Sequence, residues 1–86
     1  PTHVAVALAY APPLVAVPRV LVRAIDDLAL QVRALAARHR IPVVENPLLA
    51  RALYRDVRSG EPIPHEHYLA VAEVVIALAR AREPAA

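Results

Sequence analysis

The chain has 86 residues, a net charge of +2 and no cysteine, and each of these numbers excludes a class of protein. The length is enough for one small domain but not for two. Ten arginines against eight acidic residues give a net positive charge that is too small and too scattered for a nucleic-acid binder. Without cysteine there is no disulfide and no thiol chemistry. The longest uncharged stretch, Val4 to Pro18, is interrupted by proline, so we expect neither a transmembrane helix nor a signal peptide.

The first half of the chain predicts two strands and a helix. Val4 to Tyr10 alternates large and small apolar residues, which indicates a central strand with two apolar faces. Prolines within residues 11–18 predict a connecting loop, and a short second strand follows from Arg19 to Arg23. Apolar residues at helical spacing, with acids at the start and cations at the end, predict a helix over residues 26–39.

The second half predicts one more strand and two more helices. Residues 41–45 are rich in β-branched side chains and are predicted as a third strand. Asn46 and Pro47 are a typical N-cap and first-turn pair, so a helix should start there and run to about Val57. A last helix is expected from about His65 to Arg82.

Strands that alternate with helices predict an α/β domain over residues 1–82. We expect a small central β-sheet surrounded by helices, with the first strand starting directly after Pro1. Residues 83–86 should form a frayed C-terminal tail.

Four stretches of this sequence, taken in order, resemble one known family. They are Pro1-Thr2-His3 before Val4; Ala16-Val17-Pro18-Arg19-Val20; Ile41-Pro42-Val43-Val44-Glu45-Asn46 running into Leu49-Ala50-Arg51-Ala52-Leu53-Tyr54; and Ile63-Pro64 leading into Tyr68-Leu69-Ala70-Val71-Ala72-Glu73-Val74. Together they are similar to the FlhB/YscU family, the autocleaved export-switch proteins of flagellar and injectisome type III secretion. The first stretch looks like the downstream half of that family's Asn-Pro-Thr-His cleavage site.

An asparagine followed by proline has one route to self-cleavage. The proline nitrogen carries no hydrogen, which blocks ordinary deamidation. The asparagine's side-chain nitrogen can instead attack its own carbonyl carbon, close a succinimide and expel Pro1. Thr2 and His3 lie beside this bond, and they either assist proton transfer or only shape a surface turn. Asn46-Pro47 repeats the dipeptide inside the chain, but its expected role is a helix cap, and we expect no cleavage there.

The resemblance implies a role in protein export. The chain would be the fragment downstream of a self-cleaved Asn-Pro bond, with Pro1, Thr2 and His3 as cleavage-site residues and no turnover of its own. It would lie on the cytoplasmic side of the bacterial inner membrane, as part of an integral membrane protein whose upstream part is a four-helix membrane domain. Cleavage would help to switch the substrate specificity of export.

The resemblance also implies the partners. These are the upstream fragment of the same precursor, a ruler or switch protein, export substrates and other export-gate subunits. No nucleic acid, cofactor or metal is implied. The last helix lacks the tyrosines typical of flagellar members, so we favour an injectisome member of the HrcU or YscU kind.

Two residue patterns carry weaker hypotheses. Arg51, Arg55 and Arg58 recur along one predicted helix, either as a solvated face or as a docking patch for acidic partners. His65 and His67 suggest a metal site, but residues two apart on a helix point in different directions, so a surface helix start is expected.

Two other interpretations of Pro1 remain open. A terminal proline before a strand also resembles the tautomerase superfamily, in which the terminal amine is a general base, and Arg19 or Arg38 could then polarise a carbonyl. Alternatively, the chain is a free-standing adaptor from which only an initiator methionine was removed. An assay of enol–keto conversion of a phenylpyruvate-type substrate would separate the tautomerase from self-cleavage, and the codon before Pro1 would separate the adaptor from it.

Overall fold

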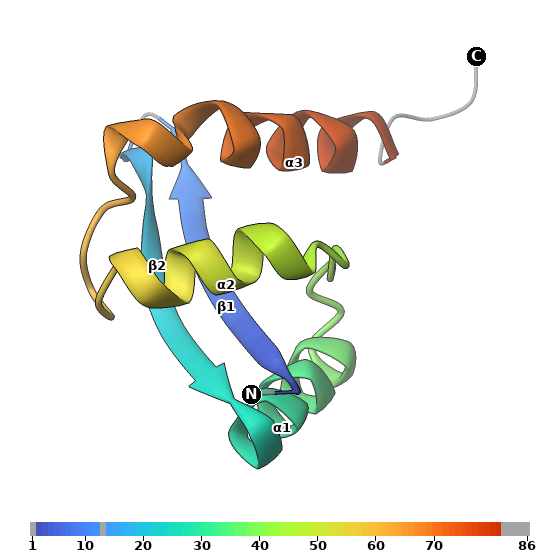
Figure 1. The fold of residues 1–86 in the computed structure, drawn as a ribbon. Coiled ribbons are helices and arrows are strands. Elements are labelled where there is room, and N and C mark those ends of the chain that lie inside the picture. The colour runs from blue at the N-terminus through green and yellow to red at the C-terminus, as the bar shows by residue number, and fades with distance from the viewer. Residues whose placement is uncertain (1, 13, 82–86) are drawn as a thin grey trace.

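The computed structural model describes residues 2–12 and 14–81, which form a β-hairpin with three α-helices (Figure 1). Pro1, Pro13, residue 82 and the predicted tail at 83–86 lie outside the described residues. The elements in chain order are β1 (Val4–Ala11), β2 (Val15–Ile25), α1 (Asp26–Arg38), α2 (Pro47–Asp56), the short 3₁₀ helix η1 (His65–His67) and α3 (Tyr68–Ala81).

The two strands pair antiparallel, from Val4 opposite Ile25 to Ala11 opposite Val15. A register shift between Ala7 and Leu8 leaves Leu21 of β2 without a partner in the ladder. Such a one-residue bulge restarts the alternation of side chains between the two faces. It therefore keeps two residues that are three positions apart, Val20 and Arg23, on the face that α2 covers.

The strand β2 is longer than predicted, because residues 15–18 belong to it and not to a loop. A second register shift, between Ala9 and Ala11, leaves Pro18 outside the paired positions, so its missing N–H costs no ladder hydrogen bond. The Pro18 carbonyl instead accepts a hydrogen bond from the Ile63 amide at 2.9 Å on the other edge of β2. The prediction of a loop over residues 11–18 is therefore wrong for residues 15–18, because Pro18 is compatible with this strand.

Residues 41–46 are not the predicted third strand. They have no regular secondary structure and are exposed to solvent. The end of α1 directs the chain into this segment: Arg40 has a φ of 56°, and the Ile41 amide donates to the Ala36 carbonyl at 2.8 Å, the pattern of a Schellman cap. A strand needs a neighbour for its backbone groups, and no described segment supplies one here.

The predicted helices are present with adjusted ends. The helix α1 starts and ends within one residue of the prediction, and α2 starts at Pro47 with the Asn46 side chain as its cap. The last predicted helix is divided, because η1 precedes α3. Among the described residues, no helix combines the length and the apolar character needed to cross a membrane.

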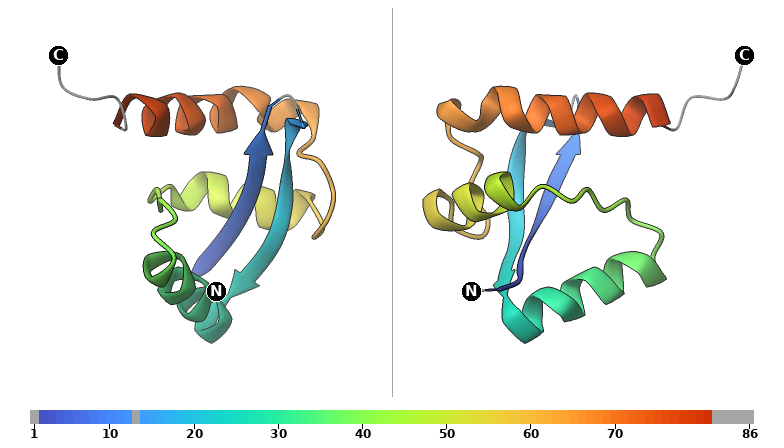
Figure 2. Two further views of the ribbon diagram at one scale, coloured as in Figure 1. Left: turned by 180° about the vertical axis from the view of Figure 1, so that it is seen from behind. Right: turned by 45° about the vertical axis from the view of Figure 1, so that its right-hand side comes forward.

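The core lies between the hairpin and the two helices α2 and α3, which pack on the same face of the strands (Figure 2). Val20 of β2 is completely buried, and Leu53 of α2 is 2% exposed. The remaining buried members of this cluster are Val57, Ile63 and Val71, and the half-buried residues packed against it are Val6, Leu8, Leu49 and Val75.

Replacing Leu53 by alanine should lower the free energy of unfolding by about 2–5 kcal/mol, because it leaves a cavity in this core. Leu48 on the same helix is 82% exposed, so Leu48→Ala should change stability by less than about 0.5 kcal/mol. Urea titration followed by circular dichroism measures both. Equal losses for the two variants would contradict this assignment of the core.

Candidate functional site

The predicted cleavage-site residues lie at the start of the hairpin, next to the first turn of α1. Thr2 and His3 are exposed, and Pro1 lies outside the described residues. The His3 carbonyl accepts a hydrogen bond from the Asp26 amide at 2.9 Å. This contact fixes the backbone of His3 against the β2–α1 junction. A cut before Pro1 would therefore create a chain end close to a residue whose backbone is anchored.

A long groove runs along the outer edge of β1, and we call it the β1 groove. Its volume is about 720 Å³. In Figure 2 (right), the chain between α1 and α2 arcs away from the strands, and residues 41–46 of this arc line the groove opposite β1. Thr2 and His3 also line it. The groove therefore joins the cleavage-site residues to the segment that was predicted as a strand.

The two edges of the hairpin are in different states. The outer edge of β2 is covered by residues 60–63, which exchange hydrogen bonds with Pro18 and Val20 and bridge Arg19. The sheet has two strands within the described residues, so the outer edge of β1 faces the β1 groove without a strand partner there. An isolated two-stranded hairpin is marginally stable and an open edge attracts further strands. The edge of β1 is thus a candidate binding site.

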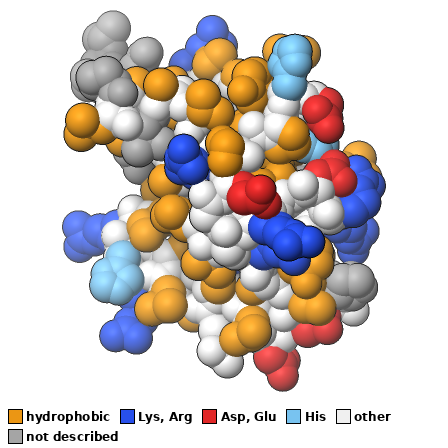
Figure 3. All heavy atoms as spheres, turned by 90° about the vertical axis from the view of Figure 1, so that its left-hand side faces the viewer, with side chains coloured by type: hydrophobic (Ala, Val, Ile, Leu, Met, Phe, Trp, Pro, Cys, Tyr) orange, Lys and Arg blue, Asp and Glu red, His pale blue; other side chains and the backbone are white. Residues whose placement is uncertain are grey.

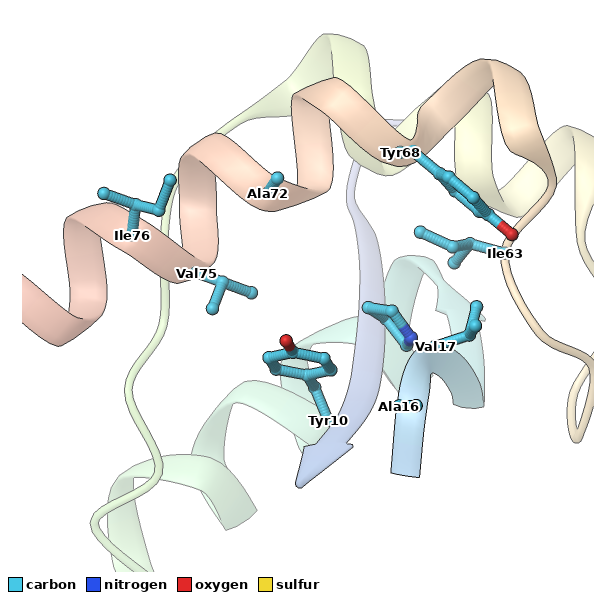
Figure 4. A pocket seen from close by; sticks show the side chains of 9 residues that line it. Tyr10, Ala16, Val17, Ile63, Tyr68, Ala72, Val75 and Ile76 are labelled. Atoms are coloured by element: carbon cyan, nitrogen blue, oxygen red, sulfur yellow. The ribbon is translucent and has the colours of Figure 1, made fainter. Parts of the chain in front are cut away.

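A second, smaller hollow lies between the hairpin end and α3, and we call it the tyrosine pocket (Figure 4). Its volume is about 340 Å³, and its lining is mostly apolar. Tyr10 extends from the end of β1 toward Val75 of α3, while Tyr68 and Ile63 close the side near the start of α3. The other lining residues are Ala16, Val17, Pro18, Ala72 and Ile76.

The three predicted partner-binding arginines do not form one basic helix face. Arg51 lines the β1 groove, Arg55 binds its neighbour Asp56, and Arg58 lies beyond the end of α2. Figure 3 faces this end of α2 and shows basic and acidic side chains next to each other. A role for these arginines in docking acidic partners stays a prediction.

Asp56 is the centre of an ion-pair network that sequence reasoning did not single out. Its carboxylate accepts from the Arg55 Nε at 2.7 Å and from a second guanidinium nitrogen at 3.0 Å, and it lies 2.7 Å from the His67 Nε2. The hydrogen bonds from Arg55 and, to a smaller extent, from His67 hold the pKa of Asp56 well below its ordinary range. The network ties the last residue of α2 to the turn that begins α3.

The two histidines of the suspected metal motif have other contacts. His67 pairs with Asp56, and the His65 ring packs against the Tyr68 ring with centroids 5.3 Å apart. Within residues 2–12 and 14–81, no group of three or more histidine, cysteine, aspartate or glutamate side chains is arranged to hold a metal ion. The expected start of a helix at His65 is the 3₁₀ turn η1.

The tyrosines were the signal that sequence reasoning missed. They are the only aromatic residues apart from histidine, and two of them line the tyrosine pocket. The third, Tyr54 of α2, lies under the Arg23 guanidinium, whose carbon is 4.6 Å from the ring centroid. The same guanidinium donates to the Tyr54 carbonyl. Arg23 and Tyr54 thus join β2 to α2 from positions far apart in the sequence.

The arginines of the tautomerase interpretation lie far from the start of the chain. Arg19 is opposite Ala9, five residues beyond Val4, which is about 17 Å along the strand. Arg38 is at the far end of α1, about 18 Å from Asp26 along the helix axis. Both arginines are therefore remote from His3 along their own elements.

Solved structures identify this arrangement as a secretion-protein C-terminal domain. The chain superposes on the crystal structure of the PscU C-terminal domain with a TM-score of 0.88 and 41% sequence identity, covering 91% of this chain and 99% of that one. The native SpaS C-terminal domain gives a TM-score of 0.89 at 28% identity, covering 94% of this chain and 93% of that chain. The predicted α/β fold is confirmed.

Sequence comparisons agree with the structural ones. A protein-family profile described as the FlhB HrpN YscU SpaS Family matches residues 1–78, and the chain belongs to this family. The flagellar biosynthetic protein FlhB of Yersinia enterocolitica is 49% identical over 75 residues, which are 87% of this chain and 20% of that protein. The hypersensitivity response secretion protein HrcU of Ralstonia nicotianae is 48% identical over the same length, 87% of this chain and 21% of that protein.

The chain therefore spans about a fifth of the curated relatives it matches. The two identities, 49% to a flagellar protein and 48% to a hypersensitivity response protein, do not separate the branches of the family. The preference for an injectisome member stays a prediction.

Removing the Asp56 charge should make the free energy of unfolding less dependent on pH in the acidic range. A carboxyl whose pKa is lowered in the folded state stabilises the protein above the ordinary aspartate pKa of about 3.9, and this contribution is lost as the pH falls below it. Asp56→Asn should be less stable than the wild type at pH 7 and closer to it at pH 3, as measured by thermal unfolding. Glu73→Gln, at an exposed position of α3, is the control. Parallel pH curves for Asp56→Asn and the wild type would contradict the network.

Proposed function

We propose that this chain is the cytoplasmic C-terminal domain of a type III export-apparatus protein that cleaves itself between an upstream asparagine and Pro1. It takes part in switching the substrate specificity of protein export. The observation that carries the proposal is the open edge of β1 directly beside Thr2 and His3, in a chain of this family. A strand that ended in the scissile asparagine would pass from that edge into the cleavage site.

The upstream fragment is the first partner of this domain. Its last strand would pair with β1 in the β1 groove and supply the neighbour that the open edge lacks. Ile41, Val43 and Val44 across the groove are 57%, 50% and 43% exposed, so a strand inserted between them and β1 would also bury apolar surface. Such pairing outlasts the loss of one peptide bond, so the cut fragments stay together.

Cleavage acts on the turn and leaves the sheet intact. Before the cut, the turn at Pro1 and Thr2 connects the upstream strand to β1. Afterwards the two ends separate, while the His3 carbonyl stays bonded to the Asp26 amide. The new surface therefore forms at the exposed end of the hairpin, where other export components have access to it.

The tyrosine pocket is the surface for an export substrate. It is apolar, open to solvent and of a size for a few side chains, and the tyrosine hydroxyls offer hydrogen bonds at its rim. We commit to a short apolar segment of an exported protein as its occupant. The ruler or switch protein and other gate subunits would use the remaining surface, including the end altered by cleavage. The full protein is anchored in the bacterial inner membrane by its upstream part, and this domain faces the cytoplasm.

Expression of the full gene should yield a downstream fragment whose mass and first residue correspond to a chain starting at Pro1. Replacing the asparagine before Pro1 by alanine removes the nucleophile and should leave the precursor intact. Intact-mass spectrometry measures both. A reading frame that begins at this point, or a cut that survives the alanine substitution, would contradict self-cleavage.

A folded precursor that cannot be cleaved should bind the ruler or switch protein with an affinity different from that of the cleaved protein. If the two forms bind with the same affinity in a titration, the new surface at the hairpin end is not what partners recognise. That result would overturn the proposed specificity switch but not the proposed self-cleavage.

Ala72→Glu should reduce the export of substrates at least tenfold, because it adds a carboxylate to the apolar lining of the pocket, and a bound apolar segment would have to desolvate it. Ala77→Glu is the matched control, since Ala77 is exposed on the same helix and does not line the pocket. Secreted substrate in the culture medium measures the effect. Equal export by the two variants would contradict a substrate site in the tyrosine pocket.

A further inference from the structure

We propose that the Asn46–Pro47 bond is a latent self-cleavage site, kept intact by contacts that hold its nucleophile and its nearest base out of position. The sequence repeats the scissile dipeptide here, and the structure assigns it to the junction of residues 41–46 and α2. The inference concerns a different bond from the one before Pro1, and it does not depend on cleavage there.

The reaction at this bond is the same intramolecular exchange of one amide for another. The Asn46 Nδ2 attacks the Asn46 carbonyl carbon, and a new C–N bond closes a five-membered imide. The bond to the Pro47 nitrogen breaks, and that nitrogen takes up the proton that Nδ2 loses. Hydrolysis of the imide by water then leaves asparagine or isoasparagine at the new C-terminus. No oxidant, reductant or external nucleophile is needed.

The electrophile is already polarised in the folded protein. The Ala50 amide donates a hydrogen bond to the Asn46 carbonyl oxygen at 2.9 Å, as the first bond of α2. Negative charge develops on this oxygen when the carbonyl carbon is attacked, so the same N–H would stabilise the tetrahedral intermediate. One part of a cleavage site is therefore present as a by-product of the helix start.

The nucleophile is held by the helix cap. The Leu49 amide donates to the Asn46 Oδ1 at 3.2 Å, which turns the carboxamide toward the helix end. Closure of the imide ring requires the carboxamide to rotate so that Nδ2 faces the carbonyl carbon of its own residue. The cap must break before that rotation, and it thus lowers the population of the reactive rotamer.

The nearest base is held by an ion pair. Glu45 precedes the bond, and its Oε1 lies 2.6 Å from a guanidinium nitrogen of Arg33 on α1. This pair directs the carboxylate toward α1 and makes it a weaker acceptor for the proton of Nδ2. Both Glu45 and Arg33 line the β1 groove together with Asn46. A rearrangement of residues 41–46 would release the base and the nucleophile together.

The cap can be removed without removing the asparagine. Leu49→Pro deletes the donating N–H at a first-turn position where proline fits a helix. Leu48→Pro is the matched control, because it places proline one position earlier and leaves the Leu49 N–H in place. During long incubation at mildly alkaline pH, Leu49→Pro should release residues 47–86 about fivefold faster than Leu48→Pro, the fold-change equivalent of one cap.

The base is tested separately. Arg33→Gln should further accelerate cleavage in the Leu49→Pro protein, and adding Glu45→Gln should abolish that gain. Asn46→Ala in the same background should stop cleavage completely, because no nucleophile remains. Intact-mass spectrometry distinguishes the imide, whose two fragments sum to the mass of the uncut chain, from its hydrolysis product, which carries one extra water.

Leu49 is half-buried against the core, so Leu49→Pro is checked by circular dichroism before use. If it does not fold, wild-type protein in urea provides the test, since unfolding breaks the cap and the ion pair together. Cleavage at Asn46 should then be faster above the unfolding midpoint than in the native protein, and absent in Asn46→Ala. The proposal is overturned if folded Leu49→Pro is cut no faster than Leu48→Pro, or if unfolded wild type is cut no faster than native.

Discussion

The fold of this chain depends on where the backbone hydrogen bonds of β1 go. One edge of β1 is satisfied by β2, and β2 in turn is covered on its far side by residues 60–63. The other edge faces a groove whose opposite wall is an extended, exposed segment. The two strands and the helices α2 and α3 hold together through the core around Val20 and Leu53, while the outer edge of β1 stays unpaired among the described residues. An open strand edge of this kind can accept a further strand, which is the basis of the pairing proposed above.

The elements that were predicted well are those whose signals are local. The helix α1 has acids in its first turn and arginine in its last, and α2 has both a capping asparagine and a first-turn proline. The errors concern strands, because a strand is defined by its neighbour and not by its own residues. Residues 15–18 became part of β2 because a bulge places Pro18 where no donor is needed. Residues 41–46 have strand-like composition and no described partner.

The candidate site was predicted only in part, for a similar reason. Thr2 and His3 were predicted by motif, since the cleavage site of the resembling family is a run of consecutive residues, and their role stays a prediction. The contacts that shape the rest of the surface join residues distant in the sequence: Arg23 with Tyr54, Asp56 with His67, and Tyr10 of β1 with α3. No local pattern specifies such pairs. Arg51, Arg55 and Arg58 have helical spacing in the sequence, but α2 ends at Asp56, before Arg58, and Arg55 pairs with that aspartate.

Asparagine followed by proline would have two opposite uses under the proposed self-cleavage, and backbone context would decide between them. Asn46 is followed by a proline that starts a helix, so its carboxamide is occupied as a cap and its carbonyl is the first acceptor of that helix. An asparagine before Pro1 would instead end a strand, with no helix N–H groups in sequence to hold its side chain. The following residues, Thr2 and His3, are exposed, and the first fixed point is the His3 carbonyl. On this argument the same dipeptide would be stable where a helix cap occupies its side chain and reactive where the side-chain nitrogen is free to face its own carbonyl.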